Sequence, residues 1–192
     1  MRFSATSLHD TWLIDPEPVA DHRGFFERTF CVHEYRERGL ETSFVQHSIS
    51  YSKQRGTMRG MHYQRAPYEE VKIVTCLKGA VRDMIIDLRL ESPTFGRWQG
   101  FELTEANRRQ LYIPAGFAHG FQTLSDDAEV GYLISQFYAP AAAHGVRHDD
   151  PAFGIDWPLP VTVMSVKDKE WPAFAPLVPP PAAALRDRQP QG

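Results

Sequence analysis

The chain has 192 residues, of which 42% are hydrophobic and 12% aromatic, so it can bury a core of normal size and is not expected to be disordered. Its formal net charge of -3 gives no electrostatic case for nucleic acid as a partner, and no apolar run approaches the roughly 20 residues of a membrane helix. Residues 1–10 lack the basic start and apolar block of a secretory signal, and the two cysteines form no Cys-x-x-Cys motif. We therefore expect a cytoplasmic protein with reduced thiols.

The first 55 residues consist of short apolar patches separated by turn residues. Prolines at positions 16 and 18 favour the edge of a sheet, and Gly39 follows a short helical pattern as a C-terminal stop. In chain order we predict an edge strand and turn in residues 1–20, a turn at 21–24, a strand at 25–30, a helix at 32–38 and a strand at 44–52.

From residue 56 to residue 138, β-prone stretches follow one another with no helical pattern between them. Lys78-Gly79 and residues 125–127 have the composition of hairpin turns. Several short strands at this spacing favour an antiparallel sandwich or barrel of the all-β class. The predicted strands are 56–64, 71–78, 80–88, 97–103, 108–113, 117–124 and 128–138.

The composition changes again in the C-terminal part of the chain. Residues 139–175 are rich in Pro, Ala, His and Asp, and we predict ordered loops and a short helix that cover the barrel, anchored by Trp157, Trp171 and Phe174. From Pro176 onward too little apolar surface remains to pack. We therefore expect one domain over residues 1–175 and a disordered Pro/Ala-rich tail over residues 176–192.

Two stretches hold most of the site-forming groups. In the first, Gly56 is followed by five residues, then His62, one residue and Gln64; the second is Pro114-Ala115-Gly116-Phe117-Ala118-His119. Both resemble the motifs of the cupins, which are small double-stranded β-helix (jelly-roll) barrels. This resemblance implies a cupin barrel with short helices and a C-terminal covering segment, and a pocket shared by the two stretches.

The first motif also bears on metal binding. In metal cupins it reads His-x-His followed by a Glu, but here Gln64 stands at the second position, and an amide is a poor replacement for an imidazole ligand. We therefore expect a site without a metal or other cofactor. The alternative is a metal-dependent dioxygenase or isomerase whose ligands are His62, Glu69 or Glu70, and His119.

Side-chain alternation creates a conflict in the first stretch. Arg59 and His62 are three positions apart, so a regular strand would point them to opposite faces. Gly60 is the position at which a bulge is easiest to build. We predict an irregular strand at Gly60 that turns both side chains toward one pocket.

A longer series of stretches, in order over residues 21–172, resembles the dTDP-4-dehydrorhamnose 3,5-epimerase family, metal-free cupins of sugar-nucleotide metabolism. The matching pieces are Asp21-x-Arg23-Gly24-x-Phe26, Arg59-Gly60-Met61-His62-Tyr63-Gln64, Lys72-Ile73-Val74, Gly79-Ala80-Val81-x-Asp83, Asp87-Leu88-Arg89, Ser92-Pro93-Thr94-Phe95-Gly96, Ile113-Pro114-x-Gly116-Phe117-Ala118-His119-Gly120-Phe121, Asp149-Asp150-Pro151, Ile155-x-Trp157-Pro158 and Ser165-x-Lys167-Asp168.

The resemblance implies a nucleotide-diphospho 4-keto-6-deoxy sugar as substrate, inverted at C3, C5 or both. The ketone acidifies the protons on both carbons, so the reaction needs a base, an acid and a donor for the enolate oxygen, but no cofactor. By resemblance, His62 is the base, Asp168 orients it, Lys72 stabilises the enolate and Tyr132 returns the proton. The family also implies a homodimer with exchanged N-terminal strands.

The resemblance further implies a set of substrate-binding residues. Arg23 and Arg59 suit the diphosphate, because a planar guanidinium donates two hydrogen bonds. His119 is expected at the sugar end, and Asp83 as a buried partner of Lys72 or His119. The full expected set is Arg23, Phe26, Gln46, Arg59, Asp83, His119, Tyr138 and Lys167.

The chain departs from the family pattern around the nucleotide. Gln46-His47-Ser48 stands where the family has Gln-Asp-Asn, Arg28 replaces a glutamate, and alanines replace the glutamate after Tyr138-Ala139-Pro140. The nucleobase, the sugar and the number of centres inverted therefore stay open. A 3-epimerase or ketoisomerase on the same scaffold, or a sugar-nucleotide binding barrel without activity, is an alternative.

Overall fold

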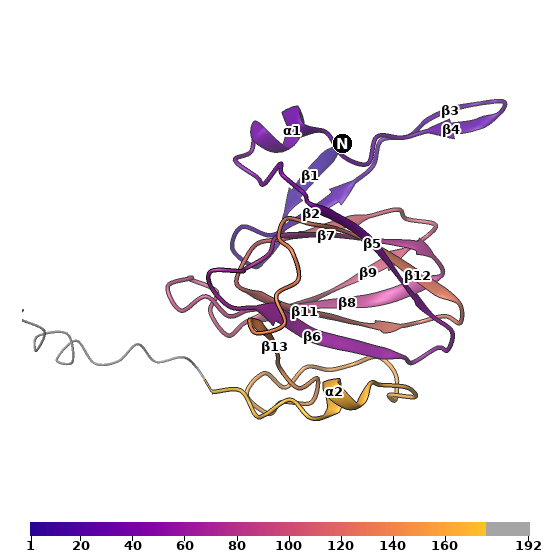
Figure 1. Ribbon diagram of the computed structural model, residues 1–192. Coiled ribbons are helices and arrows are strands. Elements are labelled where there is room, and N and C mark those ends of the chain that lie inside the picture. Colours follow the sequence, from indigo (N-terminus) through magenta and orange to yellow (C-terminus); the bar gives the residue numbers. More distant parts are fainter. Residues whose placement is uncertain (176–192) are drawn as a thin grey trace, which may run out of the picture.

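The computed structural model of the chain describes residues 1–175, and the predicted tail over residues 176–192 lies outside them. Two antiparallel sheets face each other, one of six strands and one of five, and a separate two-stranded hairpin projects from the body (Figure 1). The all-β class predicted from the strand spacing is confirmed. Among the described residues, no helix is long and apolar enough to span a membrane.

The strand order of each sheet alternates between distant parts of the chain, as expected for a closed antiparallel fold. The six-stranded sheet runs β1 (Arg2–Ala5), β2 (Trp12–Asp15), β10 (Gln110–Ile113), β7 (Lys72–Lys78), β12 (Ala128–Ile134), β5 (Gln46–Ser52). The five-stranded sheet runs β13 (Ala143–Gly145), β6 (Met58–Gln64), β11 (Phe117–Thr123), β8 (Ala80–Asp87), β9 (Trp98–Thr104). The hairpin is β3 (Val19–Asp21) and β4 (Gly24–Phe26), and the helices are α1 (Val32–Arg36) and α2 (Val166–Lys169).

The predicted strands from residue 56 to residue 124 agree with the structure to within two residues, but three other predictions are wrong. The strand expected at 25–30 stops at Phe26, because Phe30 turns inward and packs on Tyr35 at 4.8 Å between ring centroids. The strand expected at 128–138 stops at Ile134, where the chain leaves β5 and β7. The first 20 residues hold three short strands instead of a single one.

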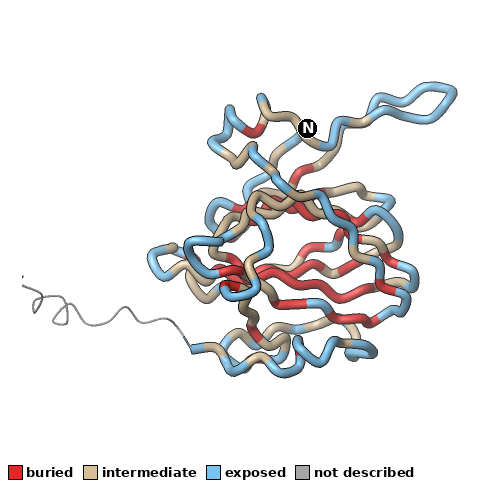
Figure 2. Tube along the Cα trace, viewed as in Figure 1, coloured by how far each residue is buried: buried red, intermediate tan, exposed pale blue. Residues whose placement is uncertain are grey.

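The five-stranded sheet is covered on both faces, which explains why its central strand, β11, is buried along its whole length (Figure 2). Its inner face packs against the six-stranded sheet through residues such as Val81 and Ile85. Its outer face carries Met84 and Ile86, which pack under the segment that holds Trp157. The predicted C-terminal covering segment is thus confirmed, and it brings α2 next to β6.

The β3–β4 hairpin projects from the body, which it contacts where the guanidinium of Arg108 lies 3.7 Å from the centroid of the Phe25 ring. Its two strands pair only with each other, from Val19↔Phe26 to Asp21↔Gly24. Val19 and Phe26 are 73% and 72% exposed, so the arm presents apolar side chains to solvent in a single copy of the chain.

Candidate active site

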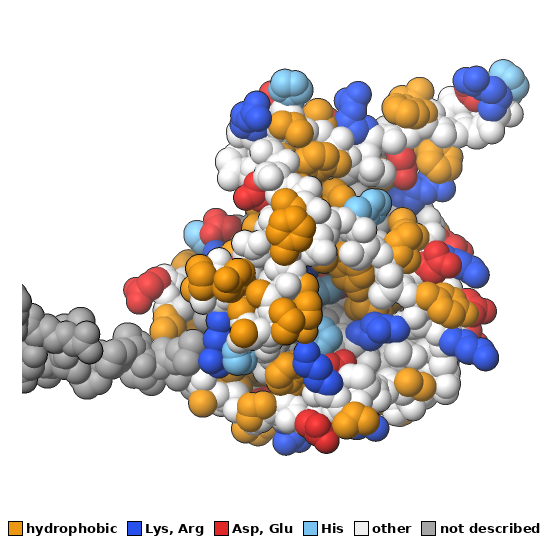
Figure 3. Space-filling view, in the orientation of Figure 1, with side chains coloured by type: hydrophobic (Ala, Val, Ile, Leu, Met, Phe, Trp, Pro, Cys, Tyr) orange, Lys and Arg blue, Asp and Glu red, His pale blue; other side chains and the backbone are white. Residues whose placement is uncertain are grey.

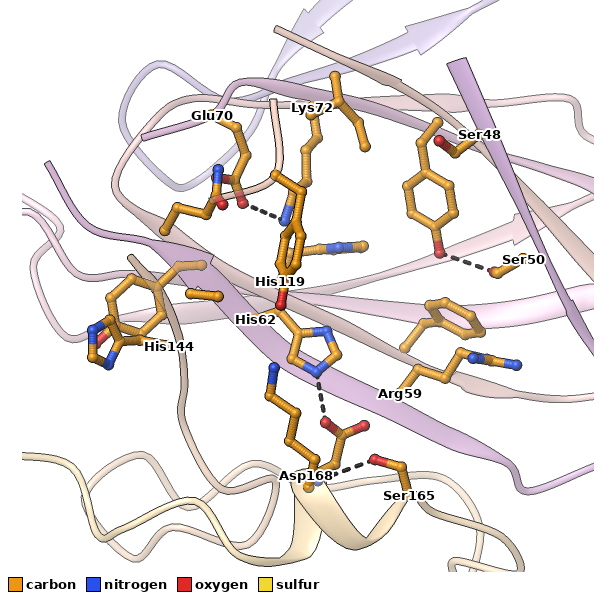
Figure 4. Close-up of a pocket in the computed structure, with 18 of the residues that line it drawn as sticks. Ser48, Ser50, Arg59, His62, Glu70, Lys72, His119, His144, Ser165 and Asp168 are labelled. Atoms are coloured by element: carbon orange, nitrogen blue, oxygen red, sulfur yellow. Dashed lines mark hydrogen bonds and ion pairs between the residues drawn. The ribbon is translucent and has the colours of Figure 1, made fainter. Parts of the chain in front are cut away.

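A cavity of about 720 Å³ lies between the two sheets, and the C-terminal segment forms part of its wall (Figure 4). Figure 3 shows the face on which it lies, with Lys and Arg side chains around a hollow in which His side chains are visible. The predicted residues that line it are Gln46, Arg59, His62, Lys72, His119, Tyr132, Tyr138, Lys167 and Asp168.

His62 and Asp168 form the shortest polar contact between two side chains of the cavity wall. His62 Nε2 lies 2.6 Å from Asp168 Oδ1, and the Asp168 side chain is only 7% exposed. Asp168 sits in the first turn of α2, where its backbone N–H donates to Ser165 Oγ at 3.1 Å. Burial alone would raise the pKa of Asp168, but its hydrogen bonds with His62 and the Gly60 amide outweigh burial and lower that pKa. Asp168 is therefore ionised at neutral pH and can accept a hydrogen bond from the imidazole of His62.

The strand that carries His62 is irregular at Gly60, as predicted. His119 pairs with His62 and Phe121 pairs with Arg59, so the register shifts between these two pairs. Gly60 has a φ of +128°, and a Cβ there would lie 2.4 Å from Gly120 Cα. The irregularity allows Arg59 and His62 to line the same cavity.

A second His–Asp pair lies deeper in the same wall. His119 Nε2 is 2.8 Å from Asp83 Oδ2, and the Asp83 side chain is fully buried. Asp83 is thus the partner of His119, not of Lys72, and it does not line the cavity itself. Its place behind His119 fits a supporting role.

Tyr132 enters the cavity from the opposite sheet. Its hydroxyl lies 3.1 Å from Ser50 Oγ, and its ring packs edge-on against His119 with centroids 6.2 Å apart. Burial raises the pKa of the Tyr132 phenol well above its ordinary value, so this group is protonated at neutral pH. It is therefore able to donate a proton or a hydrogen bond.

Lys72 lies on β7, which is flanked by β10 and β12, so a role as a protective charge on a sheet edge does not apply. Its Nζ is 3.0 Å from Glu70 Oε1, and both side chains are largely buried. The sequence pointed to Glu70 only as a possible metal ligand. Glu69 is exposed and outside the cavity wall. Within residues 1–175, no three His, Cys, Asp or Glu side chains are grouped to hold a metal ion.

Gln64 has a role that the sequence did not predict. Its amide nitrogen donates to the carbonyls of Tyr68 and Phe137, at 2.8 and 3.2 Å, and its oxygen accepts from the Ala139 N–H at 2.7 Å. These bonds fix the loop that contains Tyr68 and the loop that contains Phe137 and Ala139 at the rim of the cavity, and they place Tyr138 between two anchored residues. The position of a cupin ligand is therefore occupied by a structural clamp.

Two predicted residues lie far from this cavity within one copy of the chain. Arg23 is at the tip of the projecting hairpin, where its Nε donates to Asp21 Oδ2 at 3.1 Å. Phe26 lies on the same arm, and neither residue lines the cavity.

The geometry can be compared with known proteins. The family model for dTDP-4-dehydrorhamnose 3,5-epimerase matches residues 5–176. A protein of that name from Methanothermobacter thermautotrophicus is 43% identical over 173 residues, covering 88% of this chain and 92% of the relative. A dTDP-4-dehydrorhamnose 3-epimerase from Streptomyces niveus is 40% identical over 171 residues, covering 88% and 82%. The crystal structure of the Bacillus anthracis 3,5-epimerase with TDP and PPi bound has a TM-score of 0.87 and 38% identity, covering 90% of this chain and 99% of that one.

The facing antiparallel sheets and the polar cavity between them define a cupin-like barrel, and the matched proteins make it a sugar-nucleotide epimerase of the isomerase class. The match covers nearly all of the described residues. The chain belongs to the dTDP-4-dehydrorhamnose 3,5-epimerase family.

Proposed function

We propose that the chain inverts C3, C5 or both in a dTDP-linked 4-keto-6-deoxy sugar by proton abstraction and return through an enolate. The observation that carries this proposal is the arrangement of His62 and Tyr132. His62, held by Asp168, comes from β6 of one sheet, and Tyr132 comes from β12 of the other. A sugar between them would have a base on one face and an acid on the other.

The proton transfers follow from this arrangement. His62 takes the proton from the carbon beside the ketone, and Asp168 stabilises the imidazolium that forms. The electron pair moves onto the C4 oxygen, where the ammonium of Lys72 stabilises the negative charge. Tyr132 delivers a proton to the opposite face of the carbon, and exchange with solvent restores both residues.

The remaining cations and aromatic groups of the cavity suit the nucleotide diphosphate. Arg59 and Lys167 add positive charge to the wall, and Arg59 Nη2 already donates to the Tyr51 carbonyl at 2.8 Å, which orients its fork. Tyr138, 61% exposed at the rim, presents an aromatic face for the base, with Gln46 nearby in the lining. The TDP bound in the Bacillus anthracis structure supports thymidine as the base.

The hairpin residues fit the proposal if a second copy of the chain completes the site. Arg23 and Phe26 sit on an arm whose apolar side chains are uncovered in a single copy. We therefore propose a homodimer in which each arm reaches the cavity of the other copy and Arg23 binds the diphosphate there.

A mixed dimer tests this exchange. His62→Ala and Arg23→Ala are each expected to be inactive as homodimers. Their mixed dimer has one intact site and one doubly altered site, so it should regain about half of the wild-type activity. If each arm serves its own copy, both sites of the mixed dimer are defective, and no activity returns.

Solvent exchange tests the chemistry itself. In deuterated water, wild-type protein should introduce deuterium at C3 or C5 of dTDP-4-keto-6-deoxyglucose, and His62→Ala should abolish this exchange. Bound dTDP should still raise the melting temperature of His62→Ala, since the nucleotide contacts remain. Nucleotide binding by the wild type without any exchange would leave only a binding function.

The second candidate is inversion at C3 alone. The sequence identity to the Streptomyces niveus 3-epimerase favours it, because this identity of 40% is nearly as high as the 43% to the Methanothermobacter thermautotrophicus 3,5-epimerase. The two candidates differ in one measurable result, because a C3-specific enzyme introduces deuterium at C3 and leaves C5 protiated in the product.

A further inference from the structure

Two carboxylates line the cavity in the part of the chain that the structure describes, and they differ in how they are used. Asp168 is bonded to His62, whereas Glu70 contacts the cation that the mechanism assigns to the C4 oxygen. Figure 4 shows the Glu70–Lys72 pair on the side of the cavity away from Asp168. Glu70 is therefore the carboxylate of this wall that the mechanism does not use.

Glu70 has hydrogen-bonding capacity to spare. Its side chain is 7% exposed, Oε1 is 3.0 Å from Lys72 Nζ, and Oε2 is buried with no hydrogen-bond partner among residues 1–175. A carboxylate accepts about four hydrogen bonds, and a buried acceptor without a donor is unfavourable. Glu70 lines the cavity, and rotation about its last side-chain torsion, which is soft, changes which of the two oxygens contacts Lys72 and which can meet a ligand. A hydrogen-bond donor on a bound ligand would then pair with the carboxylate oxygen that does not contact Lys72.

The sugar offers one such donor beside Lys72. If the ammonium of Lys72 faces the C4 oxygen, the groups on the neighbouring carbons lie next to it. C5 carries a methyl group and the ring oxygen, neither of which can donate. C3 carries a hydroxyl, which donates to a carboxylate through a strong, charge-assisted hydrogen bond.

We propose that Glu70 accepts a hydrogen bond from the C3 hydroxyl of the sugar and thereby reads the configuration at C3. This inference rests on the proposed function. Inversion at C3 moves the hydroxyl to the other face of the ring, so the contact holds in one epimer and is lost in the other. Inversion at C5 leaves the C3 hydroxyl in place, which makes Glu70 a specificity-determining residue for one of the two centres.

A comparison of substrates with and without the C3 hydroxyl tests the contact. The probe is the dTDP-linked 3,6-dideoxy-4-keto sugar, and its Kd is compared with that of the 3-hydroxy substrate. Wild-type protein should bind the 3-deoxy probe about 10-fold more weakly or worse, and Glu70→Ala should bind the two with affinities within about threefold. Glu70→Leu, which keeps the volume but cannot accept, should behave like Glu70→Ala. Glu69→Ala, which changes the adjacent exposed carboxylate, should keep the wild-type ratio.

The same variants separate a direct contact from an effect through Lys72. If Glu70 only holds the lysine, Glu70→Ala weakens both ligands equally and the wild-type ratio persists, which overturns the inference. Deuterium entry gives a second readout if the enzyme exchanges both centres. Loss of Glu70 should lower the rate of deuterium entry at C3 about 10-fold more than the rate at C5. A wild-type protein that binds both ligands but catalyses no exchange would refute the proposed function while the affinity ratio still reports on Glu70.

Discussion

Asp168→Asn is the most direct test of the His62–Asp168 pair, because the amide keeps the shape of the side chain while it removes the charge and replaces one acceptor oxygen with an NH2 donor. Asp168 Oδ1 is 2.6 Å from His62 Nε2, and the backbone N–H of residue 168 still has Ser165 Oγ as its acceptor. The start of α2 should therefore persist in the variant.

The expected loss follows from the strength of a hydrogen bond to a charged group. Such a bond contributes about 1.5–3 kcal/mol net, and each 1.36 kcal/mol corresponds to a factor of ten in rate. The His62 side chain is 44% exposed, so water screens part of this interaction and the lower half of the range applies. We expect kcat to fall about 10- to 50-fold. KM should stay within about threefold, since Asp168 is assigned no contact with the nucleotide.

The assay is the initial rate of deuterium entry, measured by NMR beside a matched control. Asp149→Asn makes the same chemical change in an exposed carboxylate that is paired with Arg147 and lies outside the cavity wall. It should retain wild-type rates. Equal rates for Asp168→Asn and Asp149→Asn in folded protein would refute the assignment of Asp168 as the partner of the base.

Three further predictions concern stability and the acid. Folding lowers the pKa of Asp168, so its contribution to the free energy of unfolding is complete above the unfolded pKa of about 3.9 and is lost as the pH falls through the folded pKa. The free energy of unfolding, measured with urea, should therefore fall less steeply between pH 5 and pH 3 in Asp168→Asn than in wild type. Tyr132→Phe should lower epimer formation about 100-fold while the urea midpoint changes little, since the hydroxyl makes one bond, to Ser50; product formation near the wild-type rate would exclude Tyr132 as the acid. Gly145→Ala places a Cβ 2.2 Å from Trp171 Cε2 and should cost about 1–3 kcal/mol of stability by overpacking. Adding Trp171→Leu to this variant should restore the melting temperature, and a melting temperature that stays low would contradict the packing argument.

The sequence predicted the barrel well because two local signals agree with its long-range pairing. Alternating β-prone stretches and hairpin turns set the strands from residue 56 onward, and the His62 and His119 motifs pair directly across β6 and β11. The irregularity at Gly60 was predictable because the positions of Arg59 and His62 conflict with strand alternation. The pairing of His62 with Asp168 followed from resemblance alone, since 106 residues separate the two.

Other features depend on contacts that no local pattern encodes. The clamp by Gln64 requires two loops that meet only in the folded chain. The N-terminal hairpin was predicted only in part, because the turn at 21–24 is confirmed whereas β3 was not distinguished within residues 1–20. One signal was present but unused: Ser48 and Ser50 line the cavity, whereas Tyr51, at an alternating position of β5, lies outside its wall and is exposed. Serines at alternating positions of a strand indicate that this side of β5 borders a polar cavity rather than the core.

The C-terminal segment that carries Asp168 lies outside both sheets. Before reaching Asp168, the chain bonds to the start of β6, where the Met58 N–H donates to the Val163 carbonyl at 2.8 Å and the Thr162 N–H donates to the Gly56 carbonyl at 3.0 Å. Both sheets are complete by residue 145, so the segment that carries Asp168, the proposed partner of the base, is the last part of the described chain to be synthesised. A single protease cut in exposed residues 160–162 would release this segment at one end and leave the barrel paired. Under the proposed function, activity thus reports on the integrity of a segment that adds no strand to either sheet.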